Sequence, residues 1–243
     1  MSLPIYNQDL GIIGILAQSA PQEYTDCITF TGETSDFTLR AQYKEWNGTV
    51  EYSTDHNTWK VWNGGEISSV SGKLYLRGSG NTTFRTSYGA RFVLSAKAAC
   101  SGNIQTLLQY NNPPSDIPAK YCYWSMFDSC TNLTAAPALP ATTLKSYCYQ
   151  YMFFGCTSLT TAPELPATTL TTYCYAYMFS GCTSLKVSSI KTGAYQYAWR
   201  IPTSGTISSE PTSWNLKMLT NTGGTFTSDP SINTTYYIEN EPV

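Results

Sequence analysis

Cysteine is the residue type in this sequence that is best placed to do chemistry, because six of the eight cysteines recur at fixed spacing. They form three pairs, each with seven residues between its members: Cys122/Cys130, Cys148/Cys156 and Cys174/Cys182. Zinc sites use much shorter Cys-x2-Cys spacings. The regular period instead favours small apolar residues stacked at fixed core positions, with disulfides and metal coordination as the alternatives. Cys27 and Cys100 lie outside the pattern.

The rest of the sequence has few features of an enzyme. His56 is the single histidine, and the segment Asp55-His56-Asn57 is typical of a polar β-turn whose short side chains bond their own backbone. The sequence contains no nucleophile elbow, metalloprotease helix motif, phosphate-binding loop or dinucleotide-binding fingerprint. A glycosidase would need two carboxylates roughly 5–10 Å apart, and the repeats described below contain no telling pair. We therefore expect a non-enzymatic protein with no catalytic residues, no metal and no cofactor.

The cysteines belong to near-identical copies of one 26-residue unit. Residues 121–146 and 147–172 agree at 17 of 26 positions, and residues 173–186 form a third, partial copy. This period lies within the roughly 20–29 residues of leucine-rich repeats. One such unit cannot bury its own apolar face, whereas stacked copies share a core. The sequence therefore predicts a solenoid over residues 100–187.

Each copy has the same set of inward residues, which in the central copy are Met152, Phe153, Cys156, Leu159, Leu165 and Leu170. Upstream, residues 98–108 are predicted to form a degenerate first turn, with Cys100 in the place of Cys130. The charged residues between 121 and 185 are few: Asp128, Lys145 and Glu164. Such a nearly neutral exterior, rich in threonine and serine, would bind by shape, hydroxyls and aromatic rings and not by charge steering.

Tyrosines recur with the same period and have two interpretations. They either stack between successive turns and shield the core, or form an exposed aromatic strip for a glycan or protein partner, since tyrosine combines a flat apolar ring with a polar tip. On the second interpretation the candidate binding surface comprises Tyr123, Tyr149, Tyr151, Tyr175 and Tyr177.

Short alternating segments flank the repeats. Residues 23–99 contain about six such runs, separated by turns such as Asn47-Gly48, and this spacing is typical of a small β-sandwich. Residues 188–243 alternate again at 195–199, 214–218 and 235–238, which predicts strands that cap the open end of the solenoid. The predicted fold is therefore mainly β: an N-terminal small β-sandwich, a short leucine-rich-repeat solenoid and a β-rich C-terminal cap.

Residues 1–22 precede these modules and contain the apolar run LGIIGILA at 10–17. The run is interpreted either as an edge strand or linker packed on its own domain, or as an extended arm that docks into a larger assembly. The candidate assembly residues are Leu10, Ile12, Ile13, Ile15 and Leu16. No Lys or Arg precedes the run and two glycines interrupt it, so we expect no cleaved secretory signal.

Composition excludes several classes of protein. The chain has 243 residues, a net charge of −2 and 12% charged residues, and it contains no basic block that would indicate nucleic-acid binding. No apolar run approaches the roughly 20 residues of a membrane span, so we expect no membrane insertion. The low charge and the 19 tyrosines favour self-association into a homo-oligomer.

The motif YCYxYMFxGCTSLTTAPELPATTL resembles the BspA-type leucine-rich repeats of gut-bacterial surface proteins and of phages that infect those bacteria. With the pattern around residues 50–77, the resemblance extends over roughly residues 25–187. It implies adhesion and display, not catalysis. Bacterial members normally carry export signals and envelope anchors, which this sequence does not show. We therefore expect a phage virion protein, such as a head fibre, decoration or tail-associated protein. Its expected partners are other virion proteins and a host surface protein or glycan; the alternative is a bacterial cell-surface adhesin.

Overall fold

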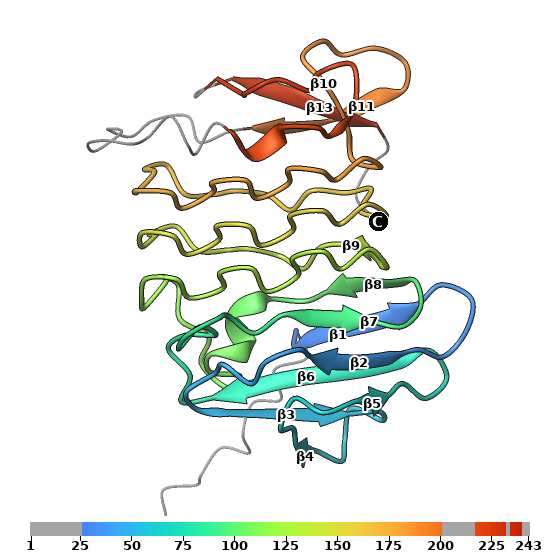
Figure 1. Ribbon diagram of the computed structural model, residues 1–243, viewed down its shortest axis with the longest axis vertical. Coiled ribbons are helices and arrows are strands. Elements are labelled where there is room, and N and C mark those ends of the chain that lie inside the picture. Colours follow the sequence, from blue (N-terminus) through green and yellow to red (C-terminus); the bar gives the residue numbers. More distant parts are fainter. Residues whose placement is uncertain (1–25, 201–216, 232–233, 240–243) are drawn as a thin grey trace, which may run out of the picture.

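The computed structural model describes residues 26–200, 217–231 and 234–239. In Figure 1 the molecule is a stack: two sheets lie at the N-terminal end, windings of irregular chain follow, and a third sheet lies at the C-terminal end. The described helical elements are short turns, of which the 3-10 helix η1 (Ile104–Leu107) is one. The prediction of a mainly β protein is confirmed.

The described residues contain thirteen short strands and the 3-10 helix η1. The strands of the N-terminal half and the first repeat are β1 (Ile28–Gly32), β2 (Thr38–Ala41), β3 (Thr49–Ser53), β4 (Lys60–Val61), β5 (Ile67–Ser68), β6 (Lys73–Ser79), β7 (Phe92–Leu94), β8 (Ala98–Ser101) and β9 (Leu133–Ala135). The later strands are β10 (Lys186–Ser188), β11 (Tyr195–Arg200), β12 (Gly223–Gly224) and β13 (Thr235–Glu239).

The N-terminal half contains a six-stranded sheet in the order β4-β3-β6-β1-β8-β9 and a three-stranded sheet in the order β5-β2-β7. Strand β6 shows why these segments form half-buried strands: its sequence KLYLRGS alternates, and Leu74 and Leu76 are fully buried. Strands β8 and β9 pair in parallel, although β8 precedes the repeats and β9 lies in the first copy. The six-stranded sheet therefore continues across the predicted boundary at residue 100.

One hydrophobic core extends from the N-terminal sheets into the repeats. The ring of Phe127, in the first repeat, lies 6.4 Å from that of Phe30 in β1 and 5.5 Å from that of Phe92 in β7. Phe92 in turn contacts the ring of Trp62 at 5.4 Å. The first repeat thus covers the apolar end of the N-terminal sheets, and the buried residues of the two parts form one continuous cluster.

The repeats wind as flat coils, each called a level here, and alternate backbone groups join one level to the next. The N–H groups of Tyr123 and Phe127 donate to the carbonyls of Cys148 and Met152 at 2.9 and 2.8 Å. The intervening Met126 donates instead within its own level, to the carbonyl of Tyr123. The second copy repeats this pattern 26 residues later. Every second N–H therefore stabilises the stack, and the others form tight turns.

These turns require left-handed backbone at every fourth residue. Positive φ angles occur at Tyr121, Ser125 and Ser129 (60°, 55° and 57°), and at the equivalent positions of the next two copies. Gly155 and Gly181 take the third of these positions in the later copies. A residue other than glycine in this region has an unfavourable backbone energy, so the stacking contacts must offset it.

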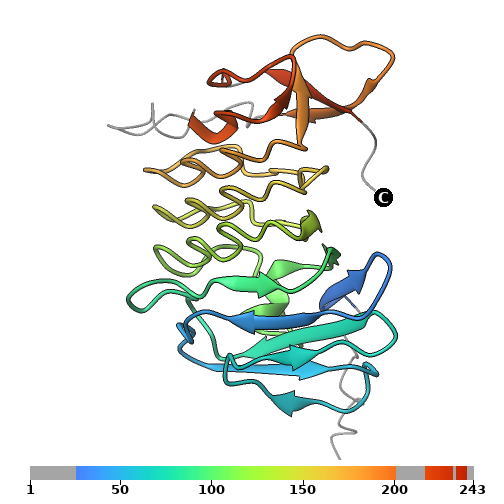
Figure 2. The same ribbon diagram turned by 45° about the vertical axis from the view of Figure 1, so that its right-hand side comes forward.

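The predicted inward residues of the central copy are confirmed as buried: Met152, Phe153, Cys156, Leu159, Leu165 and Leu170. The ring of Phe153 is stacked between those of Phe127 and Phe179, at 5.5 Å from each. Figure 2 shows the successive levels from a second direction, one directly above another.

All eight cysteines are buried free thiols. The thiols of Cys156 and Cys182 each donate to a backbone carbonyl one level earlier, those of Phe127 and Phe153, at 3.0 Å. Burial raises the pKa of Cys130 to about 11 and that of Cys182 to about 12, which keeps these side chains uncharged. Their interpretation as small core residues agrees with these positions, and the disulfide alternative does not.

The predicted place of Cys100 is wrong. Strand β8 pairs with β9 in the register Ala98↔Leu133 and Ala99↔Ala135, so Cys100 lies beyond Ala135 and not level with Cys130. The residues that do precede the first level are Phe84 and Phe92, whose N–H groups donate to the carbonyls of Cys122 and Met126 at 2.7 Å. They occupy the places of Tyr123 and Phe127 one level earlier, with seven residues between them where the repeats have three.

A further level at the other end was also missed. The segment 214–218 was expected to be a strand, but its described part, Lys217 and Met218, lies in a short 3-10 helix over 217–219 instead. The carbonyl of Met218 accepts from Phe179, and Asn221 has a φ of 59°, as Gly181 does at 78°. Strand β12 then pairs in parallel with β10, and β10, β13 and β11 complete a four-stranded sheet.

Candidate binding groove

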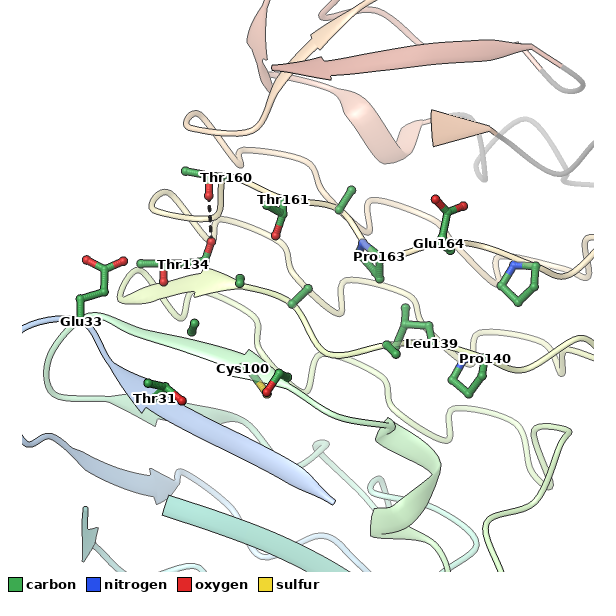
Figure 3. Close-up of a pocket in the computed structure, with 17 residues that line it drawn as sticks. Thr31, Glu33, Cys100, Thr134, Leu139, Pro140, Thr160, Thr161, Pro163 and Glu164 are labelled. Carbon is green, nitrogen blue, oxygen red and sulfur yellow. Dashed lines mark hydrogen bonds between the residues drawn. The ribbon is translucent and has the colours of Figure 1, made fainter. Parts of the chain in front are cut away.

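A groove of about 770 Å³ lies on one side of the stack. Figure 3 shows its lining: the end of β1 and strand β8 form one wall, and β9 with the segments 134–140 and 160–166 forms the other. The lining therefore combines the N-terminal sheet with the first two repeat copies. None of the predicted tyrosines lines it.

Proline and alanine in the repeat explain why a hollow forms here. The two complete copies contain the sequence APxLP at 136–140 and 162–166, in which each proline lacks a backbone N–H donor and the alanine before the first proline is small. Leu139 and Leu165 point into the core, whereas Pro140 and Pro166 are exposed on the groove side. Beside this motif the two copies are joined by hydrogen bonds from Thr160, whose N–H and hydroxyl both donate to the carbonyl of Thr134 at 3.1 Å.

The lining consists mostly of carbon with a few hydroxyl groups. Ala99, Ala135, Ala136 and Ala162 form the floor and walls, and threonines such as Thr31 and Thr161 add hydroxyls. Two carboxylates also border it, and in Figure 3 Glu33 and Glu164 lie at opposite ends of the groove. Such a surface suits contact by shape and by hydroxyl hydrogen bonds.

Residues 26–200, 217–231 and 234–239 contain no group of three or more His, Cys, Asp or Glu side chains arranged to hold a metal ion. In this part of the chain there is also no helix that is both long and apolar enough to cross a bilayer.

Three of the predicted surface tyrosines are buried, and their assignment to an exposed strip is wrong. The exposed fractions of Tyr123, Tyr149 and Tyr175 are 0%, 1% and 1%. Their rings stack in the core, 5.7 and 6.0 Å apart, and the hydroxyl of Tyr123 donates to Gln105 Oε1 at 3.0 Å. The positive φ angles two residues before and after each of them turn these side chains inward.

Tyr151 and Tyr177 are half-buried, and their rings stack on each other at 5.1 Å with an angle of 7° between the planes. The rings of Tyr121, Tyr147 and Tyr173 form a second half-buried ladder, 4.6 and 5.1 Å apart, that sequence reasoning did not select. In both ladders the inner ring faces are occupied by neighbouring rings. These ladders therefore support the interpretation of stacking between turns.

The remaining candidate residues were those of the assembly arm: Leu10, Ile12, Ile13, Ile15 and Leu16. They lie outside the described residues. The groove residues contributed by the repeats, by contrast, recur in both complete copies of the repeat. The sequence feature that could have indicated the groove is the APxLP motif, in which alanine and proline recur at Ala136/Ala162 and Pro140/Pro166.

Comparison with known proteins adds no relative to this description. A scan against protein-family models, a search of curated proteins and a search of solved structures each found no match.

Proposed function

We propose that this chain is a non-enzymatic structural and display protein of a phage particle, and that it presents its repeat surface for attachment to a host surface protein or glycan. In this proposal the repeats are a leucine-rich-repeat solenoid between a β-sandwich-like module and a β-rich cap. The observation that carries it is the bonding of successive levels: the N–H of Phe127 donates to Met152, and that of Phe153 to Met178. Such a stack is rigid and repeats the same surface along its length.

The groove supports an attachment role. Its alanine, proline and threonine side chains are uncharged. They recur with the repeat, so the two copies of the motif form neighbouring parts of one surface. A binding partner that contacts several levels can gain affinity from many weak contacts without a single strongly charged one.

The setting on a phage particle rests on the resemblance of the repeat motif to BspA-type repeats. The proposed partners are accordingly other virion proteins, with a further copy of this chain in a homo-oligomer. The same resemblance motivates the second candidate, a bacterial cell-surface adhesin.

Mass spectrometry of purified particles tests the first candidate. We expect this polypeptide in particles that have been purified through a density gradient and washed with high salt, and particles that lack it would overturn the proposal. The control is surface labelling of intact bacteria that produce the chain with a membrane-impermeant amine reagent. Labelled protein on intact, unlysed cells, together with particles that lack it, would favour the adhesin.

A further inference from the structure

Two arginines in this structure are held in the same way, each between two aromatic rings. The guanidinium of Arg77 lies 4.1 Å from the ring centre of Trp59 and 4.2 Å from that of Tyr110. The guanidinium of Arg85 lies 4.1 Å from Tyr121 and 4.2 Å from Trp124. Both cations are therefore fixed in position by cation–π contacts.

The two arginines differ in whether a carboxylate pairs with the guanidinium. Arg77 Nε donates to Glu51 Oε2 at 2.7 Å, because β3 and β6 pair with Glu51 opposite Arg77. Arg85 has no ion pair with any carboxylate of the described residues, and its buried Nε has no hydrogen-bond partner among them. A guanidinium normally has its donors satisfied, most strongly by a planar oxyanion. The arrangement at Arg85 is thus the same aromatic clamp as at Arg77, without the carboxylate.

The surroundings of Arg85 include an exposed aromatic surface. Tyr88 is 70% exposed and Tyr43 is 42% exposed, and their rings lie 5.6 Å apart. Gly89, next to Tyr88, packs closely on Trp124, where an added Cβ would come within 2.7 Å of the ring. Arg85 and the Tyr88 segment therefore meet on the same tryptophan.

Glu45 is hydrogen-bonded to the residues that follow Arg85, and its carboxylate already accepts hydrogen bonds from them. Glu45 Oε2 accepts from the N–H and hydroxyl of Thr86 at 2.8 and 2.6 Å, and from the N–H of Ser87 at 2.5 Å. Its charge is shared among three donors, and it forms no ion pair with Arg85.

From this geometry we infer that Arg85, with Trp124 and Tyr88, forms a binding site for an acidic glycan. The carboxylate or sulfate of an acidic sugar pairs with the guanidinium, and a sugar ring lies on the exposed face of Tyr88. The inference names the class of glycan and a site whose residues are not among those that line the groove, and it holds whether or not the chain belongs to a particle.

The aromatic surface favours a glycan over an acidic peptide. A pyranose ring presents apolar C–H groups on one face and carries its charge on a substituent at the edge, and this combination matches a flat exposed ring beside a fixed cation. A polyglutamate peptide carries the same negative charge without a flat C–H face to lie on the ring.

Isothermal titration of the full chain tests the inference with four probes: an oligosaccharide of uronic acids, a sulfated oligosaccharide, a neutral oligosaccharide of equal length and a hexaglutamate peptide. We expect the two acidic glycans to bind, the neutral one to bind at least about tenfold more weakly, and the affinity for the acidic glycans to fall as salt is raised. Equal binding of hexaglutamate would overturn the glycan inference in favour of an acidic peptide. No binding of either acidic glycan would overturn the site itself.

Variants locate the binding. Arg85→Gln should lower the affinity for the acidic glycans at least about tenfold, and Arg85→Lys should not restore it, because lysine lacks the planar fork of donors. The matched control is Arg77→Gln, which should lower the melting temperature by leaving Glu51 unpaired but keep the glycan affinity. Tyr88→Ala replaces an exposed side chain, so it tests the site even if Arg85→Gln impairs folding; it should weaken glycan binding severalfold. Unchanged affinity in both Arg85→Gln and Tyr88→Ala would place the glycan elsewhere.

Discussion

The backbone N–H of Phe179 donates to the carbonyl of Met218 at 2.9 Å, the same contact that Phe153 makes with Met178 one level earlier at 3.0 Å. The first pair is 39 positions apart in the sequence and the second 25, so the chain leaves the stack after β10 and returns to it. Gly181 likewise donates to Thr220, as Gly155 does to Ser180. Residues 217–224 therefore close the stack as a level of different sequence.

Met218→Ala tests this closing level. Met218 is 2% exposed, and its truncation should lower the free energy of unfolding by about 2–5 kcal/mol, because a buried methionine leaves a cavity. Urea denaturation followed by tyrosine and tryptophan fluorescence measures the change. The control is Ile190→Ala, which removes a side chain that is 67% exposed and should change stability by less than about 0.5 kcal/mol. Equal effects of the two substitutions would contradict a packed closing level.

Phe153→Ala should lower the free energy of unfolding by about 3–5 kcal/mol, because its ring is stacked between two others in the centre of the core. The neighbouring Tyr151→Ala should cost about 1 kcal/mol, since a half-buried ring loses its stacking with Tyr177 and edge contacts with Trp124 and Phe154. Thermal and chemical unfolding of both variants compare the two positions. A larger effect at Tyr151 than at Phe153 would reverse the assignment of inside and outside.

Two buried tyrosine hydroxyls differ in their partners, which gives a matched pair of substitutions. Tyr123 Oη donates to Gln105 Oε1 at 3.0 Å, whereas Tyr149 Oη is buried with no hydrogen-bond partner among the described residues. Tyr123→Phe should lower stability by about 0.5–1.5 kcal/mol, and Tyr149→Phe should leave it unchanged or raise it. Denaturant midpoints of the two variants at equal protein concentration decide the question; equal losses would mean that Tyr149 has a partner too.

The stability of the protein should depend on the ionisation of Glu45. Burial alone would raise its pKa, but hydrogen bonds from Thr86, Ser87 and Tyr88 outweigh burial and lower the pKa below the ordinary value of about 4.3. A lowered folded-state pKa contributes stability above the unfolded-state value, and this contribution is lost as pH falls through the folded-state pKa.

Unfolding of the wild type and Glu45→Gln should therefore be compared between pH 3 and 7. We expect the wild type to be the more stable at pH 7 and the difference to shrink below about pH 4.3. A difference that grows towards acidic pH would have the opposite sign and would contradict the hydrogen-bonded carboxylate.

Thiol titration tests the cysteine positions. All eight cysteines are buried, and burial raises the pKa of Cys27 to about 11 and that of Cys174 to about 12. At pH 8 the native protein should therefore react very slowly with an aromatic disulfide reagent, because the thiolate is the nucleophile. In denaturant without reductant, all eight should react. Fewer than eight would indicate disulfides.

Repetition in the sequence by itself determined the period of the stack and the identity of its inward residues. Identical residues 26 positions apart must occupy equivalent environments if the copies stack, so Met152, Phe153 and Cys156 could be assigned to the core from their recurrence. Alternation in 73–76 and 235–238 likewise indicated strands, which the structure forms at 73–79 and 235–239.

Tertiary structure alone decided which way the tyrosines face and where the stack begins and ends. The side chain of Tyr149 points inward because the positive φ angles of Tyr147 and Tyr151 turn the backbone on either side of it, and a recurring tyrosine carries no sign of that rotation. Phe92 and Met218 join the stack through backbone hydrogen bonds, which any side chain permits. The clamp around Arg85 likewise brings together Tyr121 and Trp124, more than thirty residues away, and only the folded chain places them there.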